Sequence, residues 1–406
     1  MRPRILFLTE SFHPVLGGGE AHVRALSRRL AALGMAPTVV TRRSDAAWPR
    51  VETLDGVKVI RVPPSGPGRA GKYAMVPAAL ASLRSERRRH EVLVVRGTRV
   101  LGLPGLLAGR ALVKAVVLQA EVNGEMSGEV FTWGTSLEAS WLRPLVERAV
   151  RARNRLLGDA DAFVAMSRRI REEFLEAGVP ERRIAYIPHG VDLARFRPPT
   201  SEEKREARRA LGLAAHELIA TYTGRLLRGK GLMALVEAFA VVARRDSRSR
   251  LLLVGSGAGQ SLSVEEELKA AVVERGLDGR VTFAGRVDDV RPHLWASDVF
   301  VFPSEFEALG LSLVEAAACG LPCVGARTGG IVDVIEEGRS GLLFEPGDAG
   351  ALAECVEAVL AAPARAAAFG ARGREVARER FDLDESAERY AALFAELAGR
   401  AGTTGN

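Results

Sequence analysis

The sequence is poor in cysteine and contains no long apolar run. Its three cysteines, Cys319, Cys323 and Cys355, are too few for a disulfide framework, and their spacing, with no histidine nearby, is unlike that of a zinc site. We interpret them as packing residues of a protein from a reducing compartment. No run of 18 apolar residues occurs, and the apolar stretch at residues 5–8 is too short for a signal peptide. These absences predict a cytoplasmic protein and leave peripheral attachment to the inner membrane surface open.

Lysine is also scarce, although the chain as a whole is basic. Only six of the 57 basic residues are lysines, and the formal net charge is +7. Residues 1–190 carry a net charge of +12 and residues 191–406 a net charge of −5, which predicts two lobes with different partners. No basic stretch is interleaved with aromatic residues, so a nucleic-acid partner is disfavoured. With 47% hydrophobic and 26% charged residues among 406, the chain is predicted to be globular, with two or three domains.

Short apolar runs alternate with helix-like stretches in both halves of the chain. The predicted strands are residues 5–8, 38–41, 57–62, 92–95, 113–118 and 162–165, and then 218–223, 250–254, 281–283, 299–302 and 323–326. Apolar strands separated by helices are typical of parallel sheets, so we predict an α/β protein with two similar lobes and a ligand cleft between them. Residues 187–209, with three prolines and many charges, are predicted to be the linker, and residues 383–397 an amphipathic helix.

The first candidate site is a glycine loop between the first strand and its helix. Residues 17–19 are three consecutive glycines, followed by Glu20. Glycines let a ligand approach the backbone closely, and the start of the next helix offers free N–H groups to a phosphate or a sugar. The spacing is not G-x-G-x-x-G, which disfavours a dinucleotide site, and a plain flexible turn remains the alternative.

Two further candidates also follow predicted strands. Residues 223–231 hold Arg225 and Lys230, which can both reach an anion over the turn, although the segment lacks the spacing of a P-loop. Glu307 lies in the next loop of interest, and Glu315 lies eight residues later inside an apolar helix, where an unpaired carboxylate is costly. Two such carboxylates can hold the hydroxyls of one sugar-like ligand. The alternatives are a solvated basic turn and two surface glutamates.

These motifs, together with residues 189–192 and 320–331, resemble those of the retaining glycosyltransferases of family 4, and the resemblance covers nearly the whole chain. It implies the GT-B fold, with two Rossmann-like lobes facing each other across a cleft and a C-terminal helix that returns to the N-terminal lobe. Residues 1–190 and 381–406 would form the acceptor-binding domain, and residues 191–380 the donor-binding domain. The implied reaction moves a hexose from a nucleoside diphosphate sugar to an acceptor hydroxyl in polysaccharide, glycolipid or other glycoconjugate synthesis.

The resemblance also implies a role for each motif residue. Arg225 and Lys230 would neutralise the donor diphosphate, and Glu315 would bind the ribose hydroxyls. Glu307 and the backbone that follows it would hold the donor sugar, so that Arg225, Lys230 and Glu307 are the implied catalytic residues. The rest of the implied nucleotide and diphosphate site is Gly18, Gly19, Gly224, Gly255, Gly257, Arg286, Val287, Leu309, Gly310 and Leu311. No metal and no cofactor is expected, because the two cations already face the charge that grows on the leaving diphosphate.

One departure from the family concerns the loop after residue 118. Many relatives carry a histidine there that contacts the donor sugar, and this chain has none between residues 119 and 128. One of the polar residues of this loop is expected to contact the donor sugar or the acceptor instead, and the alternative is a mobile polar loop. The full set of such candidates is His13, Gln119, Glu121, Asn123, Glu125, His189 and Ala308.

Two other classes of function remain as alternatives. A nucleotide-sugar epimerase or a disaccharide phosphorylase could use the same fold, and a non-catalytic sugar-nucleotide binding protein could retain it with a decayed site. The intact Arg225, Lys230, Glu307 and Glu315 argue against a decayed site. The excess positive charge of the N-terminal half predicts an acceptor that is anionic or carried by a membrane, either a sugar, a lipid-linked sugar or a small molecule.

Overall fold

The computed structural model describes residues 2–15, 17–66, 68, 70–129, 143–260 and 262–403. The chain divides into two compact units: unit 1 comprises Met1–His189 and Leu383–Asn406, and unit 2 comprises Gly190–Asp382. Both boundaries lie within two residues of those predicted from the sequence. Unit 1 contains 32 basic and 22 acidic residues and unit 2 contains 25 and 28, so that their net charges are +10 and −3.

Unit 1 contains an eight-stranded sheet in the order β3-β4-β2-β1-β5-β6-β7-β8, parallel except for β3. Its central strands are buried on both faces, as expected of a parallel sheet covered by helices, and this burial explains their continuous apolar sequences. The strands are β1 Arg4–Leu8, β2 Ala36–Arg42, β3 Val51–Leu54, β4 Val57–Val62, β5 Val92–Arg96, β6 Ala115–Gln119, β7 Ala162–Ala165 and β8 Ile184–Tyr186.

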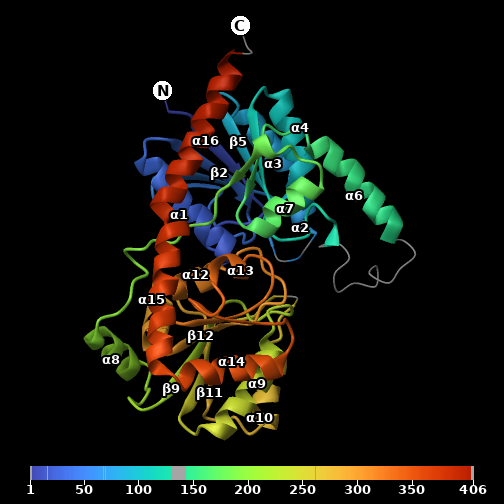
Figure 1. Ribbon diagram of the computed structural model, residues 1–406. Coiled ribbons are helices and arrows are strands. Elements are labelled where there is room, and N and C mark those ends of the chain that lie inside the picture. The colour runs from blue at the N-terminus through green and yellow to red at the C-terminus, as the bar shows by residue number, and fades with distance from the viewer. Residues whose placement is uncertain are drawn as a thin grey trace. The chain divides into compact units, whose positions relative to one another are not determined.

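The helices of unit 1 follow the strands in alternation. They are α1 Gly18–Ala32, α2 Gly71–Ala74, α3 Val76–Ser85, the π-helical turn η1 Thr98–Gly102, α4 Leu103–Ala111, α6 Arg143–Leu157, α7 Arg168–Glu176, the 3-10 turn η2 Glu181–Arg183 and α16 Leu383–Thr403. The last of these, red in Figure 1, comes from the far end of the chain and lies beside α1 and against β5 and β6.

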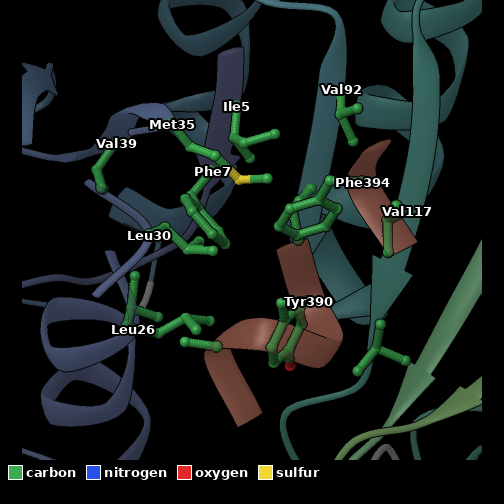
Figure 2. Packing of buried hydrophobic residues seen from close by; sticks show 14 of the residues in the cluster. Ile5, Phe7, Leu26, Leu30, Met35, Val39, Val92, Val117, Tyr390 and Phe394 are labelled. Atoms are coloured by element: carbon green, nitrogen blue, oxygen red, sulfur yellow. The ribbon is translucent and has the colours of Figure 1, made fainter. Parts of the chain in front are cut away.

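The apolar face of α16 is part of the core of unit 1 (Figure 2). The ring of Phe394 packs edge-on against Phe7 of β1 at a centroid distance of 6.3 Å, and Tyr390 lies 5.7 Å from Phe394. Ala387 and Leu397 are buried in the same cluster, which also includes Leu26 and Leu30 of α1. The amphipathic face predicted for this helix is therefore confirmed.

Unit 2 contains a fully parallel six-stranded sheet in the order β11-β10-β9-β12-β13-β14. The strands are β9 Leu218–Thr223, β10 Ser249–Val254, β11 Val281–Gly285, β12 Val299–Phe302, β13 Cys323–Ala326 and β14 Gly341–Phe344. The helices are α8 Ser201–Ala210, α9 Leu232–Arg245, α10 Glu265–Glu274, α11 Arg291–Ala296, α12 Leu311–Ala318, α13 Ile331–Val334, α14 Ala349–Leu360 and α15 Pro363–Arg380. The predicted α/β class with two Rossmann-like lobes is confirmed.

The prediction of a linker over residues 187–209 is wrong for its second half. The boundary between the units does fall after His189, but Ser201–Ala210 form helix α8. Thr200 caps this helix in a reciprocal capping box with Glu203, and Arg208 pairs with Asp298. The charges that resembled a linker are the solvated face and the anchors of a helix.

Candidate functional site

In each sheet the strand order changes direction at one point. In unit 1 the chain builds outward from β1 on one side and from β5 on the other, and in unit 2 it does so from β9 and β12. Ligands of open parallel sheets bind outside the carboxyl ends of the strands at such a switch point. The three sequence motifs follow β1, β9 and β12, so all of them lie at these two switch points.

The switch point of unit 2 is bridged by an ion pair. Nζ of Lys230, in the turn after β9, lies 2.7 Å from Oε2 of Glu307, in the turn after β12. Both side chains are partly accessible, at 20% and 15% exposure. The Ser304 hydroxyl and the Ala308 N–H also donate to the Glu307 carboxylate, at 3.3 and 3.2 Å. The structure thus brings together two of the three implied catalytic side chains.

Arg225, the third, lies in the same turn as Lys230 and is exposed. The Tyr222 hydroxyl donates to the Arg225 carbonyl at 3.1 Å and shapes this turn. The pKa of Tyr222 is raised by burial and by the nearby Glu307 charge, while the Arg225 charge opposes the shift. Both charged side chains therefore act on the same buried phenol, which places Arg225 near the Lys230–Glu307 pair.

Glycines allow the turns of unit 2 to pack this closely. A Cβ atom on Gly231 would lie 1.9 Å from the Pro303 carbonyl oxygen, and a Cβ on Gly255 would lie 1.8 Å from that of Gly224. Gly231 also has a φ of 65° and Gly255 a φ of 133°, which disfavour other residues. Gly257 packs similarly, against Ser263 and the Leu226 carbonyl.

Two helices begin at these turns. Helix α9 starts after Gly231, and helix α12 starts after Gly310, whose φ is 89°. Neither N-terminus is capped by a side chain. Leu309 is buried and Leu311 is partly buried, so they offer backbone groups rather than side chains to a ligand. The first-turn N–H groups can therefore bind an anion directly.

Glu315 lies on α12 with part of its side chain accessible. Burial raises the pKa of this carboxyl to about 7, against the opposing charge of Arg195, and Asp289 raises it further. Glu315 lies in the second turn of α12, the helix that follows the turn of Glu307. Arg286 lies three residues before Asp289 in the sequence, and its side chain is exposed. Val287 packs against the small apolar cluster of Ile219, Leu252 and Val254.

The switch point of unit 1 holds a different kind of pair. Arg96 ends β5 with its side chain only 1% exposed, and its guanidinium lies 2.6 Å from Oε1 of Glu121, just after β6. The same guanidinium donates to the Gly19 carbonyl at 3.1 Å, and a Cβ on Gly19 would lie 3.1 Å from Oε2 of Glu121. Glu121 keeps 30% exposure. Gly18 is the first residue of α1, so the glycine loop and this pair form one surface.

The pKa of Glu121 is raised to about 7. Burial is the main cause, and it outweighs the attraction of Arg96, while Glu20, Glu125 and Glu10 raise the pKa further. A carboxyl with this pKa exchanges its proton near neutral pH and can donate as well as accept a hydrogen bond. Of the loop candidates, Glu121 is the one with both accessibility and a shifted pKa.

Glu125 is not a ligand-facing residue, contrary to its place among the candidates. It is buried, and its carboxylate accepts from the Thr98 N–H at 2.5 Å, the Thr98 hydroxyl at 2.7 Å and the Glu121 N–H at 3.1 Å. The neighbouring carboxylate of Glu173 accepts from the N–H groups of Gly124 and Met126, and of Ser127. The alternative of a mobile polar loop is not supported for residues 121–127, because the buried carboxylates of Glu125 and Glu173 hold the backbone of this segment.

His189 and Gln119 also turn inward. The His189 ring stacks on His22 of α1 at a centroid distance of 3.7 Å, and the Gln119 amide nitrogen lies 2.8 Å from His189 Nε2. Burial holds the pKa of both histidines well below the usual value, so both are neutral at physiological pH. Arg96 and His22 were not among the candidates from the sequence, although both belong to this group of polar residues. The only sequence signal for either is the position of Arg96 at the end of an apolar strand.

Two other candidates have different surroundings. The His13 ring is 3.2 Å from the Arg24 guanidinium, and burial, Arg24 and Arg61 lower its pKa. Asn123 is buried at 7% exposure, which leaves little of its side chain accessible to a ligand.

The described part of the chain has no group of three His, Cys, Asp or Glu side chains that could hold a metal ion. Of its helices, none has the length and apolarity needed to cross a bilayer. Cys319 and Cys323 are buried, and burial raises their thiol pKa values, as expected of packing residues.

Comparison with known proteins identifies the family. The model of "Glycosyltransferase Family 4" matches residues 16–195, and that of "Glycosyl transferases group 1" matches residues 217–362. D-inositol 3-phosphate glycosyltransferase 2 of Catenulispora acidiphila is 30% identical over 368 residues, covering 87% of this chain and 84% of that protein. A GDP-mannose-dependent alpha-(1-6)-phosphatidylinositol monomannoside mannosyltransferase of Mycolicibacterium smegmatis is 27% identical over 98% of both chains.

Solved structures agree with the sequence relatives. Sucrose-phosphate synthase from Thermosynechococcus elongatus superposes with a TM-score of 0.82 at 28% identity, covering 98% of this chain and 100% of that one. HepE of Anabaena, solved with UDP-glucose, gives a TM-score of 0.77 at 21% identity over 97% of this chain and all of that one, which shows the shared fold. The prediction of a glycosyltransferase is confirmed, and the epimerase, phosphorylase and non-catalytic alternatives gain no support. The chain belongs to the GT-B-fold glycosyltransferases of family 4.

Proposed function

We propose that this enzyme transfers a hexose, with retention of configuration, from a nucleoside diphosphate sugar bound by unit 2 to a hydroxyl of a phosphorylated sugar or polyol bound by unit 1. The observation that carries the donor assignment is the Lys230–Glu307 ion pair across the switch point of unit 2. It sets a cation and a hydrogen-bonded carboxylate side by side at the edge where parallel sheets bind ligands.

The two halves of the pair suit different parts of the donor. Glycosyl transfer passes through an oxocarbenium-like state while negative charge grows on the leaving diphosphate. Lys230 and the exposed Arg225 can meet that charge, together with the uncapped starts of α9 and α12. Glu307 is already held by Ser304 and the Ala308 N–H, so it can accept from sugar hydroxyls without reorganising. The leaving phosphate would take the acceptor proton on the same face.

Glu315 suits the ribose. The pKa of its carboxyl is raised to about 7 because the group is poorly solvated. Two vicinal hydroxyls would donate hydrogen bonds to it and stabilise its charged form. Arg286 and Val287 would border the base. The positive charge at the donor site comes from Arg225 and Lys230, so we propose that no metal takes part.

Unit 1 is proposed to bind the acceptor through the Arg96–Glu121 surface. Glu121 occupies the loop where relatives carry a histidine, and its carboxyl is set to donate or accept near neutral pH. A phosphorylated acceptor is supported by the net charge of +10 on this unit. The names of the relatives point the same way, since they include inositol 3-phosphate, a phosphatidylinositol mannoside and sucrose-phosphate.

The test is an assay of nucleoside diphosphate release with UDP-, GDP- and ADP-hexoses against free and lipid-linked phosphorylated polyols. Lys230→Gln should reduce turnover by about two orders of magnitude or more. Lys269→Gln is the control, because Lys269 also pairs with glutamates in unit 2 but on the exposed face of α10. Wild-type turnover in Lys230→Gln would contradict the donor assignment, and release that needs no acceptor hydroxyl would contradict the reaction.

A further inference from the structure

A second basic feature of unit 1 lies far from the glycine loop. It is a cavity of about 560 Å³, which we call the amino-edge cavity. Its lining comes from the end of α4, the segments before β6, β7 and β8, and the last turns of α16: Arg110, Val113, Lys114, Ala115, Asp159, Ala160, Asp161, Arg182, Arg183, Leu397 and Arg400. None of these residues belongs to the donor or acceptor surfaces described above.

The cavity lies at the opposite edge of the unit 1 sheet from the Arg96–Glu121 surface. Ala115 is the first residue of β6, and the cavity residues 159–161 and 182–183 directly precede β7 and β8. Arg96 and Gln119, by contrast, are the last residues of β5 and β6. A five-residue strand is about 16 Å long, so the amino-edge cavity is separated from the Arg96–Glu121 surface by roughly that distance. A ligand of ordinary sugar size cannot occupy both.

Positive charge is in excess in this cavity. Five cationic and two acidic side chains line it, and Arg400 also pairs with Glu396 outside the lining. One of the two carboxylates, Asp161, lies 3.8 Å from Arg110 and accepts from the Val116 N–H at 2.8 Å. Arg183 donates to the carbonyls of Gly158 and Ala160, at 2.8 and 3.4 Å, which fixes the guanidinium without cancelling its charge. Burial and the charge of Arg4 lower the pKa of Lys114, with Glu91 opposing them. An anion would relieve this excess.

The mouth of the cavity carries a strained residue. Val113 ends the turn after α4 with a φ of 55°, and its side chain is 75% exposed. A β-branched residue rarely adopts this left-handed conformation, where glycine is the usual choice after a helix. Strained positions of this kind collect at binding sites, and Lys114, the next residue, also lines the cavity.

We propose that the amino-edge cavity binds a phosphate monoester through Arg110, Lys114, Arg182 and Arg183. Arginine forks match the oxygens of a phosphate dianion, and an excess of cations from several elements is the arrangement that such a ligand needs. The bound phosphate also touches α16 through Leu397 and Arg400. The same helix also contains Tyr390, whose ring lies 6.4 Å from that of His22. Helix α16 therefore extends from the amino-edge cavity to the stacked histidines near the other edge of the sheet. The ligand is either a free sugar or polyol phosphate or the headgroup of a lipid.

The experiment measures binding of two probes to the full chain. Glycerol 3-phosphate represents the free source, and phosphatidylcholine vesicles with phosphatidic acid represent the lipid source. All proteins carry Arg225→Gln and Lys230→Gln, so that the proposed diphosphate site does not contribute. The double variant Lys114→Gln/Arg182→Gln removes two cations of the cavity, and Arg88→Gln removes an exposed arginine of the same unit that does not line it.

The expected result is binding of at least one probe, weakened about tenfold or more by Lys114→Gln/Arg182→Gln and unchanged by Arg88→Gln. The arm that responds identifies the source of the phosphate. The proposal is overturned if neither probe binds, if the double variant binds as tightly as its parent, or if Arg88→Gln weakens binding equally. Equal melting temperatures of the proteins without probe exclude a folding defect. The donor site is disabled and the proposed acceptor surface is unchanged in every protein, so a difference between the parent and Lys114→Gln/Arg182→Gln reports on the amino-edge cavity and not on the proposed reaction.

Discussion

Each switch point pairs a cationic side chain with a glutamate, but the two pairs differ in how deeply they are buried and in how they are charged. In unit 2 a lysine and a glutamate, both partly accessible, pair across two turns, and glycines bring the backbone of these turns into contact. In unit 1 the arginine of the corresponding pair is buried, its glutamate has a pKa near 7, and two stacked neutral histidines lie beneath. Fixed charge suits a diphosphate that keeps its charge, whereas a carboxyl that titrates near neutral pH suits hydroxyl groups. Each of the following predictions tests this contrast.

The largest effect is expected from the ion pair of unit 2. Lys230→Gln and Glu307→Gln should each lower kcat/KM by about two to three orders of magnitude, or roughly 3–4 kcal/mol, because both face charge that develops in the transition state. The double variant should lose little more than either single variant, since the two residues act as one unit. Steady-state kinetics of the four proteins measures this cycle. Losses that simply add would show that the residues act independently.

The second prediction concerns the glycines of unit 2. Gly255→Ala places a Cβ against the backbone oxygen of Gly224, which no side-chain movement can relieve, and should lower the free energy of unfolding by about 3 kcal/mol or more. Gly279→Ala is the control, because Gly279 also has a positive φ, 71°, but has open space around its Cβ position. It should cost only about 1 kcal/mol. Chemical denaturation measures both, and equal losses would remove the argument from close packing.

The third prediction tests the titration of Glu121 through the pH dependence of stability. The pKa of Glu315 in unit 2 is also raised to about 7, but its contribution is the same with and without the Glu121 carboxyl. The pKa of Glu121 is raised from 4.5 to about 7 in the folded state, so the folded protein holds this proton more tightly and loses stability as pH rises through that range. One such proton contributes at most about 1.4 kcal/mol per pH unit. Glu121→Gln should therefore flatten the fall in unfolding free energy between pH 5 and 7, whatever constant offset follows from leaving Arg96 without its partner. An unchanged slope would show that Glu121 does not titrate there.

How far the sequence predicts this molecule depends on whether its signals are local. Strands such as β5 and β12 are buried on both faces and were predicted from their apolar runs, but β3 has no buried residue and β8 has only three residues, so neither stands out. The charged helix α8 resembles a linker in its composition. The spacing of Thr200 and Glu203 does signal a capping box, but the partner of Arg208, Asp298, lies 90 positions along the chain and is revealed only by the fold.

The same distinction holds for the two switch points. In unit 2 the residues proposed to contact the diphosphate and the donor sugar, Arg225, Lys230 and Glu307, lie within seven positions of a strand end, where glycines and charges can be recognised. The Lys230–Glu307 pair spans 77 positions, so unit 2 was predictable because each of its residues lies in a recognisable turn, and not because the pair is local. In unit 1 no comparable motif surrounds Arg96 or Glu121, which are 25 positions apart, and the stacking of His22 on His189 spans 167 positions. Only the folded sheet brings such residues together, which is why the sequence offered several polar candidates in this loop and could not choose Glu121.

The smallest effect on stability, and the sharpest contrast with Gly255, is expected at Gly19. A Cβ at this position would lie 3.1 Å from Oε2 of Glu121 and 3.5 Å from a nitrogen of Arg96, and both are ends of side chains that can shift by a few tenths of an ångström. Gly19 lies in the first turn of α1, where alanine favours the helix by up to about 1 kcal/mol. Gly19→Ala should therefore change the unfolding free energy by less than about 0.5 kcal/mol, yet raise the KM for the acceptor by displacing Glu121. A loss of stability like that of Gly255→Ala would mean that the glycine loop of unit 1 is built for packing, and that the difference between the two switch points is one of degree.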